Sequence, residues 1–186
     1  MKIYLLASLI AALSFLATTQ VHAANLITNP CFAGGSTSGW SLDAPYTATT
    51  TTSAGGCTWS VNQNQAAGSG YNNFYTAPVV TVTPNATYTL QFWYNMSSTN
   101  PTHLQINYPS AFGTNYLDVS VTSTGQTWVE TQQTFNAGNA TTVAVRFYNN
   151  NGAVNAYYDD FDLDLSSNFI TNPVIKMIMR ILAWGW

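Results

Sequence analysis

Apolar and polar side chains alternate with a period of two in several short segments, and this alternation restricts the fold more than any other feature. Residues 87–95 read TYTLQFWYN, and the same pattern recurs in 102–108 (THLQINY) and 142–149 (TVAVRFYN). Successive side chains of a β-strand point to opposite faces, so each segment presents one apolar face and one polar face. We therefore expect strands with one face in a core and the other in solvent.

Further segments also favour strands. Residues 57–63, 77–84, 116–123 and 127–135 have strand-like composition, and turn-forming stretches such as AGG (54–56), GSG (68–70) and NNNGA (149–153) punctuate the chain. No convincing helix occurs in the sequence before residue 170. Short strands separated by turns in this way predict an all-β protein that folds as a two-sheet antiparallel β-sandwich.

The two ends of the chain differ from this pattern. Residues 1–23 combine Lys2, the apolar run IYLLASLIAALSFLA and the ending VHA, which is typical of a secretory signal peptide; a retained membrane anchor is the alternative. We assign the sandwich to residues 24–166. Within the tail, 167–186, the segment NPVIKMIMRILAWGW (172–186) favours an amphipathic helix that contacts a membrane surface or a protein. The alternative is an extension with little structure, or one that docks on the sandwich.

Secretion fits the cysteine usage. The chain after residue 23 holds two cysteines, Cys31 and Cys57, and an even pair in an oxidising compartment predicts one disulfide. Asn-x-Ser/Thr triplets at Asn85, Asn95 and Asn139 are predicted glycosylation sites. We expect a secreted, extracellular protein, with association to a cell wall or cell surface as a further option.

Charged residues make up 6% of the chain, and their distribution excludes one class of partner. Between residues 25 and 165, Arg146 is the single base against seven acids. Such a segment cannot neutralise phosphates, so we expect no nucleic-acid binding. A surface of Thr, Ser, Asn, Gln and Tyr suits uncharged, hydroxyl-rich ligands, and it equally suits a glycosylated wall protein.

The polar faces of three predicted strands carry a candidate binding surface. If these strands are neighbours, the faces form one trough with aromatic rings for sugar stacking and planar polar groups for hydroxyls. The alternatives are that Trp93 packs in the core and that Arg146 pairs with an acid. Tyrosines at 71, 75 and 116 could line the rim. The candidate residues are Gln91, Trp93, His103, Gln105, Asn107, Arg146 and Tyr148.

Four of the seven acids lie in one stretch, AYYDDFDLDL (156–165). Alternation places Asp159 on the same face as Phe161, pointing inward, where a carboxylate needs a partner. Asp160, Asp162 and Asp164 share the opposite face, and their separation of about 7 Å overlaps that of a glycosidase carboxylate pair. A solvated strand face is the plainer interpretation of these acids.

Three motifs resemble the family 4/9-type (CenC-type) carbohydrate-binding modules. They are NLITNPCFAGGSTSGW (25–40), VTPNATYTLQFWYNMSS (82–98) and AYYDDFDLDL (156–165), in the order and spacing of that family. The resemblance implies a galactose-binding-like jelly-roll sandwich that binds glycans, usually β-linked chains, in a groove on one sheet. Such modules are normally attached to glycoside hydrolases, whereas no catalytic domain is visible in this sequence.

The resemblance also implies a structural calcium ion. Asp159 would be one of its ligands, because calcium takes oxygen ligands. The family's opening motif usually continues Phe-Glu, and that Glu helps to hold the metal, but here Ala33 takes its place. The alternative is that Asp159 accepts hydrogen bonds from backbone N–H groups.

These features together predict a secreted, monomeric, non-catalytic module that binds neutral polysaccharide. A structural or adhesive protein of the cell wall or cell surface is one alternative. A small glycoside hydrolase that uses Asp and Glu is another. Burial of the candidate aromatic side chains would favour the structural protein, and two carboxyl groups facing each other in a cleft would favour the hydrolase.

Overall fold

The computed structural model describes residues 25–150 and 152–166, with the Asn150 side chain left aside. These residues form strands joined by turns and one short 3-10 turn, η1 (Ala33–Gly35). The strands are β1 (Gly39–Leu42), β2 (Tyr46–Thr49), β3 (Ser60–Gln65), β4 (Tyr71–Ala77), β5 (Val80–Thr81), β6 (Thr87–Met96), β7 (Thr102–Tyr108), β8 (Thr114–Val121), β9 (Val129–Asn136), β10 (Thr142–Asn150) and β11 (Val154–Leu165). The predicted signal peptide and the predicted helical tail lie outside the described residues.

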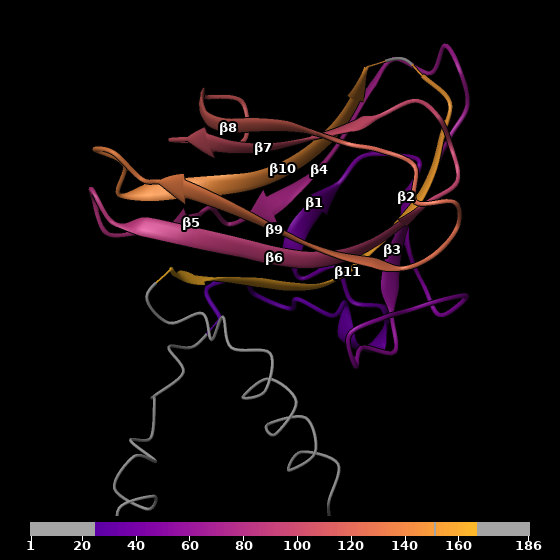
Figure 1. Ribbon diagram of the computed structural model, residues 1–186, viewed down its shortest axis with the longest axis horizontal. Helices are drawn as coiled ribbons and strands as arrows, with labels where there is room; N and C mark the ends of the chain where they lie inside the picture. The colour runs from indigo at the N-terminus through magenta and orange to yellow at the C-terminus, as the bar shows by residue number, and fades with distance from the viewer. Residues whose placement is uncertain (1–24, 151, 167–186) are drawn as a thin grey trace, which may run out of the picture. The chain divides into compact units, whose positions relative to one another are not determined.

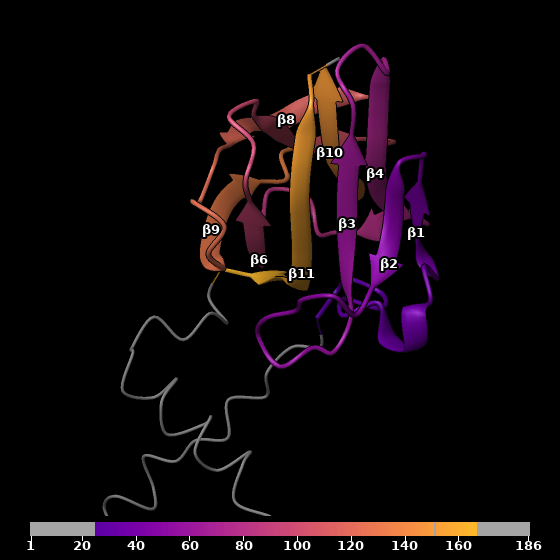
Figure 2. The same cartoon turned by 90° about the vertical axis from the view of Figure 1, so that its right-hand side faces the viewer.

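The strands form two antiparallel sheets. Sheet A has the order β1-β4-β10-β7-β8, with β5 paired to one end of β10. Sheet B has the order β2-β3-β11-β6-β9. Figure 1 shows β7, β8 and β10 above β6 and β11, and Figure 2 turns the molecule so that β3 and β11 lie side by side, both nearly vertical. The predicted two-sheet antiparallel β-sandwich is confirmed.

The core lies between the two sheets and follows the predicted alternation. Most apolar side chains of one parity on β6, β7 and β10 are buried, and so are aromatic side chains from β4 and β11. Phe74 stacks on Phe147 with ring centroids 5.2 Å apart, which joins the middle of sheet A, and Phe92 stacks on Phe161 at 5.6 Å across sheet B. Within 25–150 and 152–166, no helix has the length and apolar character to cross a bilayer.

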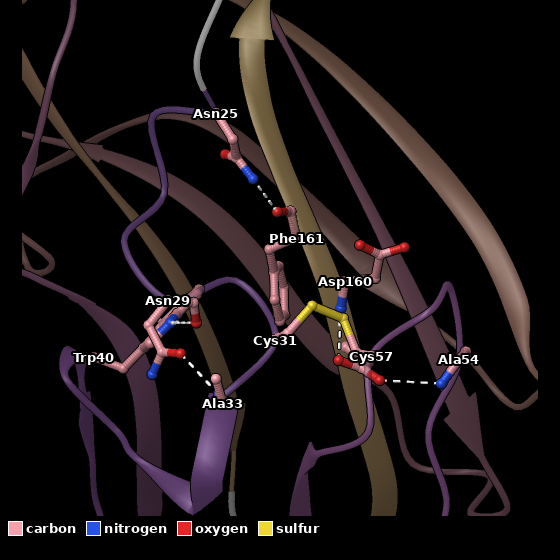
Figure 3. Close-up of a disulfide and its surroundings, with 10 residues drawn as sticks. Asn25, Asn29, Cys31, Ala33, Trp40, Ala54, Cys57, Asp160 and Phe161 are labelled. Atoms are coloured by element: carbon pink, nitrogen blue, oxygen red, sulfur yellow. Dashed lines mark hydrogen bonds between the residues drawn. A yellow bond between two sulfur atoms is a disulfide. The ribbon is translucent and has the colours of Figure 1, made fainter. Parts of the chain in front are cut away.

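The opening motif, 25–40, is structural. The Asn25 side chain donates to the Phe161 carbonyl and accepts the Leu163 N–H, so it ties the start of the sandwich to β11 (Figure 3). Asn29 accepts the Ala33 N–H at 2.8 Å and donates to Ser36, which fixes the turn. The turn carries Phe32 into the core against Trp40 and Phe161.

Strand β11 contains a β-bulge that changes which way its first acids point. Asp159 pairs with Trp93 and Asp162 pairs with Gln91, so β11 holds one more residue than β6 over this interval. Asp160 is the residue with the left-handed backbone, at φ 50°. The expectation that Asp159 shares the inward face with Phe161 is therefore wrong, because a bulge breaks strict alternation. Asp159 lies on the outer side of sheet B.

The loop 50–59, between β2 and β3, is fixed to the outer side of sheet B. The predicted disulfide between Cys31 and Cys57 is present, with 5.3 Å between the Cα atoms (Figure 3). The Ala54 N–H donates to Asp159 at 3.0 Å, and the Trp128 indole donates to Thr52 at 2.9 Å. These three contacts fasten the loop to the opening motif, to β11 and to the segment before β9.

Candidate functional site

The outer face of sheet A gathers polar side chains from four neighbouring strands. We define this face by eight residues: Asn73 and Tyr75 on β4, Arg146 and Tyr148 on β10, His103, Gln105 and Asn107 on β7, and Asp118 on β8. Alternation turns these residues away from the core, and strand register aligns them. Arg146 lies opposite Gln105, and Tyr148 lies opposite His103. Five of the seven predicted site residues therefore share one surface: His103, Gln105, Asn107, Arg146 and Tyr148.

Gln91 and Trp93 do not belong to this surface. Their strand, β6, pairs with β11 and β9 in sheet B, so the expectation that all three candidate strands are neighbours is wrong. Alternation tells inner from outer faces but does not tell which sheet a strand joins. Gln91 instead bonds to Glu130, and the half-buried Trp93 lies opposite Asp159 on the outer side of sheet B. Trp93 is thus neither a core residue nor a neighbour of Arg146.

Arg146 is the centre of the outer face of sheet A. Its Nε donates to Asn73 Oδ1 at 2.9 Å, and its Nη1 donates to Gln105 Oε1 at 3.0 Å. Asn73 in turn donates to Asp43 Oδ2 at 2.9 Å. Partial burial lowers the pKa of Arg146 from its usual value, and the nearby Tyr148, Asp43, Tyr46 and Asp118 oppose that shift. Two side-chain amides, those of Asn73 and Gln105, therefore hold the guanidinium in one orientation.

Asp118 organises the other side of this surface. Its carboxylate accepts Gln105 Nε2 at 2.6 Å and lies 3.1 Å from His103 Nδ1. A polar chain thus runs across the sheet from Asp43 through Asn73, Arg146 and Gln105 to Asp118. Gln105 is nearly buried, whereas Asp118 is exposed. The chain is anchored in the sheet and reaches solvent at its ends.

Aromatic rings pack along the same surface. The His103 ring stacks on Tyr148 with centroids 4.8 Å apart, and the Arg146 guanidinium lies 4.7 Å from the centre of the Tyr148 ring. Arg146 also lies 4.7 Å from the ring of Phe112, which comes from the loop between β7 and β8. Burial raises the pKa of Tyr148, with a smaller contribution from Asp118, so the phenol stays neutral.

Phe112 and Asn73 are residues that the sequence analysis did not select. Phe112 sits in a loop, where alternation gives no information, and its one signal is that a large apolar residue follows the turn residues Pro109 and Ser110. Asn73 lies between the suggested rim residues Tyr71 and Tyr75 on β4, and strand alternation points all three side chains to the same face. Tyr116 is half-buried and packs on Tyr108, with ring centroids 6.1 Å apart.

Comparison with known protein families and solved structures shows which proteins this chain resembles. A family model described as "Carbohydrate binding domain", of the 4/9 type, matches residues 24–155. The chain belongs to the family 4/9 carbohydrate-binding domains. No curated protein sequence matches the chain.

Solved structures share the fold of this carbohydrate-binding domain at low identity. One is TmCBM61 in complex with β-1,4-galactotriose, with TM-score 0.59 and 19% identity over 77% of this chain and 100% of that chain. Another is the CBM22-1 xylan-binding domain from Paenibacillus barcinonensis, with TM-score 0.56 and 15% identity over 73% of this chain and 90% of that chain.

A third structure is much longer than this chain. It is the enzymatically active domain of tailspike protein 4 of Bacteriophage CBA120, with TM-score 0.64 and 14% identity over 76% of this chain. The match covers 21% of that chain, so this carbohydrate-binding domain spans about a fifth of its length.

The surroundings of Asp159 do not fit the calcium ion that the family resemblance implies. Its side chain is fully buried, and its two oxygens accept the N–H groups of Ala54 at 3.0 Å and Asp160 at 2.8 Å. Among the His, Cys, Asp and Glu side chains of the described residues, the group around Asp159 is completed by Cys31 and Cys57, whose sulfurs form the disulfide. Calcium requires six to eight oxygen ligands. The contacts of Asp159 match the alternative of backbone N–H acceptance.

Burial also changes the acidity of Asp159. Desolvation raises its pKa to about 7, and this increase is opposed by the two backbone hydrogen bonds and reinforced by the neighbouring charge of Asp160. The group therefore titrates near neutrality inside the fold.

The predicted glycosylation sites lie at different depths. Asn85 and Asn139 are exposed, which an attached glycan requires. Asn95 is half-buried in β6, and its side-chain amide donates to the Gln126 carbonyl at 3.2 Å. Glycosylation at all three positions stays a prediction.

Proposed function

We propose that this chain is a secreted, monomeric, non-catalytic domain that binds uncharged polysaccharide on the outer face of sheet A. The observation that carries the proposal is the polar chain through Arg146, which holds planar amides and a guanidinium in fixed positions beside aromatic rings. Sugars present apolar C–H faces and hydroxyl edges. Rings and planar polar groups on one surface complement both.

The charges on this face favour neutral ligands. The guanidinium of Arg146 bonds to the amides of Asn73 and Gln105. These amides in turn bond to two carboxylates, Asn73 to Asp43 and Gln105 to Asp118. An anionic sugar would meet two carboxylates beside the one guanidinium, which disfavours its binding. Hydroxyl groups can donate to the carboxylates and accept from the amides, so they match the surface without an added charge.

The relatives support a β-linked neutral chain as the ligand. TmCBM61 was solved with β-1,4-galactotriose, and the CBM22-1 domain is described as xylan-binding. We extend this class of ligand to the present chain as a proposal. Extracellular location, in solution or on a cell wall or surface, follows from the signal-like residues 1–23 and belongs to the same proposal.

Two of the four acids of β11, Asp159 and Asp164, support a non-catalytic role. Asp159 is buried and engaged by two backbone N–H groups, so it cannot reach a substrate without losing both bonds. Asp164 is also buried, with 2% of its surface exposed, and it accepts the N–H of Leu165. A glycosidase needs two accessible carboxyl groups on either side of the scissile bond.

Affinity electrophoresis tests the proposal. Residues 1–186 would be expressed in a secreting host, and the purified product run through gels that contain xylan, β-1,4-galactan, hydroxyethyl cellulose or polygalacturonate. We expect retardation by at least one neutral polysaccharide and none by polygalacturonate. Gln105→Ala should lower the affinity at least tenfold, because it removes the link between Arg146 and Asp118.

Trp93→Ala is the matched control for that experiment, because it removes an aromatic side chain from the outer side of the opposite sheet. It should leave the retardation unchanged. Retardation that survives Gln105→Ala but is lost in Trp93→Ala would move the site to sheet B. Absence of retardation by every polysaccharide would contradict the proposed function.

A further inference from the structure

We infer that Phe112, together with the hollow beside it, forms a ring-stacking subsite for one sugar of the bound glycan. The inference rests on the proposed function, because it assigns a role within the same binding face. It names a residue that supplies an open aromatic ring beside Arg146. Neither the family match nor the fold neighbours assign this position.

The predicted stacking residues Tyr148 and Trp93 are less available for stacking, whereas Tyr71 on β4 is a second open ring, 66% exposed. Tyr148 is half-buried, with His103 stacked on its ring at 4.8 Å and the Arg146 guanidinium 4.7 Å from its centre. Trp93 lies on the opposite sheet. Phe112, in contrast, is 63% exposed although it is a large apolar residue. A ring in that position loses unfavourable contact with water when a sugar covers it.

Phe112 is also held in place before any ligand binds. The Arg146 guanidinium lies 4.7 Å from the ring centre, and Tyr75 makes an edge contact at 5.5 Å. With these two contacts in place, 63% of the residue is still exposed and open to a ligand. An immobilised ring gives stronger stacking than a mobile one, because less conformational entropy is lost on binding.

The loop that carries Phe112 is short and tightly bonded. The Gly113 N–H donates to the Ser110 carbonyl at 3.0 Å, and Asn107 Nδ2 donates to the Gly113 carbonyl at 3.4 Å. A Cβ atom at Gly113 would lie 1.9 Å from the Tyr108 carbonyl oxygen, so only glycine allows this close return of the chain. The loop therefore projects Phe112 across β7 and β10 toward Tyr75 on β4.

A hollow lies between this loop and the end of β4. Its walls are mostly apolar, and they adjoin the polar chain at Arg146, so one ligand could place a C–H face in the hollow and its hydroxyl edge beside the guanidinium. The lining residues are Tyr75, Thr76, Ala77, Pro78, Val79, Ser110, Ala111 and Phe112. This pairing of an apolar wall with an adjacent polar group is what a sugar ring requires.

The base of the loop holds a buried polar side chain. Asn107 is 1% exposed, and its Oδ1 atom has no hydrogen-bond partner among the described residues. A buried acceptor without a partner is costly, so a buried water molecule at the base of the loop is expected to satisfy it. The carbonyl that Asn107 already bonds belongs to Gly113, next to Phe112.

The test compares Phe112→Ala, Phe112→Tyr and Val129→Ala with the unaltered protein, by affinity electrophoresis on the neutral polysaccharide that retards it most. Phe112→Ala should weaken binding at least tenfold, and Phe112→Tyr should stay within threefold because the ring is retained. Val129 is 38% exposed on β9 of sheet B, so Val129→Ala is the control for loss of an exposed apolar side chain and should bind normally.

Thermal unfolding of each variant separates binding from folding, and the exposed Phe112 predicts little change in melting temperature. Equal retardation of Phe112→Ala and the unaltered protein would overturn the subsite and leave the proposed function standing. Lost binding in both Phe112→Ala and Phe112→Tyr, with folding intact, would also overturn it, because stacking would not be the cause. No retardation of the unaltered protein by any polysaccharide would overturn both proposals.

Discussion

The Asp159 carboxylate accepts a hydrogen bond from the Ala54 backbone N–H at 3.0 Å, which joins the last strand of the sandwich to a loop 105 residues earlier. The same loop is tied to the opening motif by the disulfide between Cys31 and Cys57. The neighbourhood of Asp159 therefore has a structural role, and the outer face of sheet A, on the other layer, carries the candidate binding chemistry.

The raised pKa of Asp159 predicts that the protein is less stable at high pH. Its pKa is about 7 in the folded state, against 3.8 for an ordinary aspartate, so between these values the folded state binds more protons than the unfolded state. The contribution to the free energy of unfolding is complete below about pH 4 and is lost as the pH rises through 7. We expect a loss of about 2–4 kcal/mol from this group between pH 4 and pH 8.

Urea unfolding at several pH values measures this effect, with Asp159→Asn as the variant. Because asparagine cannot ionise, the free energy of unfolding of the variant should change less over the same pH range. A variant with the same pH dependence as the unaltered protein would show that other groups cause it.

Reduction of the disulfide should destabilise the fold, whereas chelators should not. Cys31 and Cys57 are 26 residues apart, and a loop of that size corresponds to about 3 kcal/mol in the chain-entropy model. We expect Cys31→Ser/Cys57→Ser to lower the free energy of unfolding by about that amount. Addition of EDTA should leave the melting temperature unchanged, since the oxygens of Asp159 are engaged by N–H groups. A drop in melting temperature with EDTA, restored by calcium, would contradict this account.

Gly55 should tolerate no side chain. Its φ is +67°, and an added Cβ would lie 1.7 Å from the Asp160 carboxylate. Gly68→Ala is the matched control, because Gly68 has a similar φ of +80° and open space around it. Gly68→Ala should lower the free energy of unfolding by about 1–2 kcal/mol through backbone strain alone. Gly55→Ala should lower it by about 1–3 kcal/mol more, because the added Cβ overlaps with Asp160. Equal melting temperatures for the two variants would show that Asp160 moves away freely.

Arg146→Lys should weaken both stability and glycan binding. A lysine ammonium cannot reproduce the planar fork that joins Asn73 to Gln105, so at least one of these acceptors loses its partner. We expect a loss of about 1–3 kcal/mol in the free energy of unfolding. Polysaccharide binding should fall at least tenfold, because the polar chain is interrupted at its centre. Retention of both properties would show that positive charge alone is sufficient at this position.

Strand identity and the inner and outer faces followed from alternation, because burial requires each strand of a two-layer fold to show one apolar face. Leu90, Leu104 and Val145, on the apolar faces of these segments, are completely buried. The pairing of strands did not follow in the same way. Trp93 and Tyr148 have the same pattern around them, yet β6 and β10 lie in different sheets, which depends on long-range connections that no local pattern records.

Two further features had no local signal. The bulge at Asp160 reverses the direction of Asp159, and a bulge leaves the composition of a strand unchanged. Phe112 is placed against Arg146 by the tight turn at Gly113, so its position depends on loop geometry rather than on periodicity. The five correctly grouped residues of the outer face of sheet A all lie on β7 and β10, which are adjacent strands.

The order of strands has a consequence for biosynthesis. β10 lies between β4 and β7 in sheet A, and β11 lies between β3 and β6 in sheet B, although both come after those neighbours along the chain. While the protein is being translated, each half-formed layer therefore keeps unpaired edges until these two late strands emerge, and such edges invite aggregation. Closure of both layers, and with it recognition by the finished surface, must wait for nearly the whole sandwich to leave the ribosome.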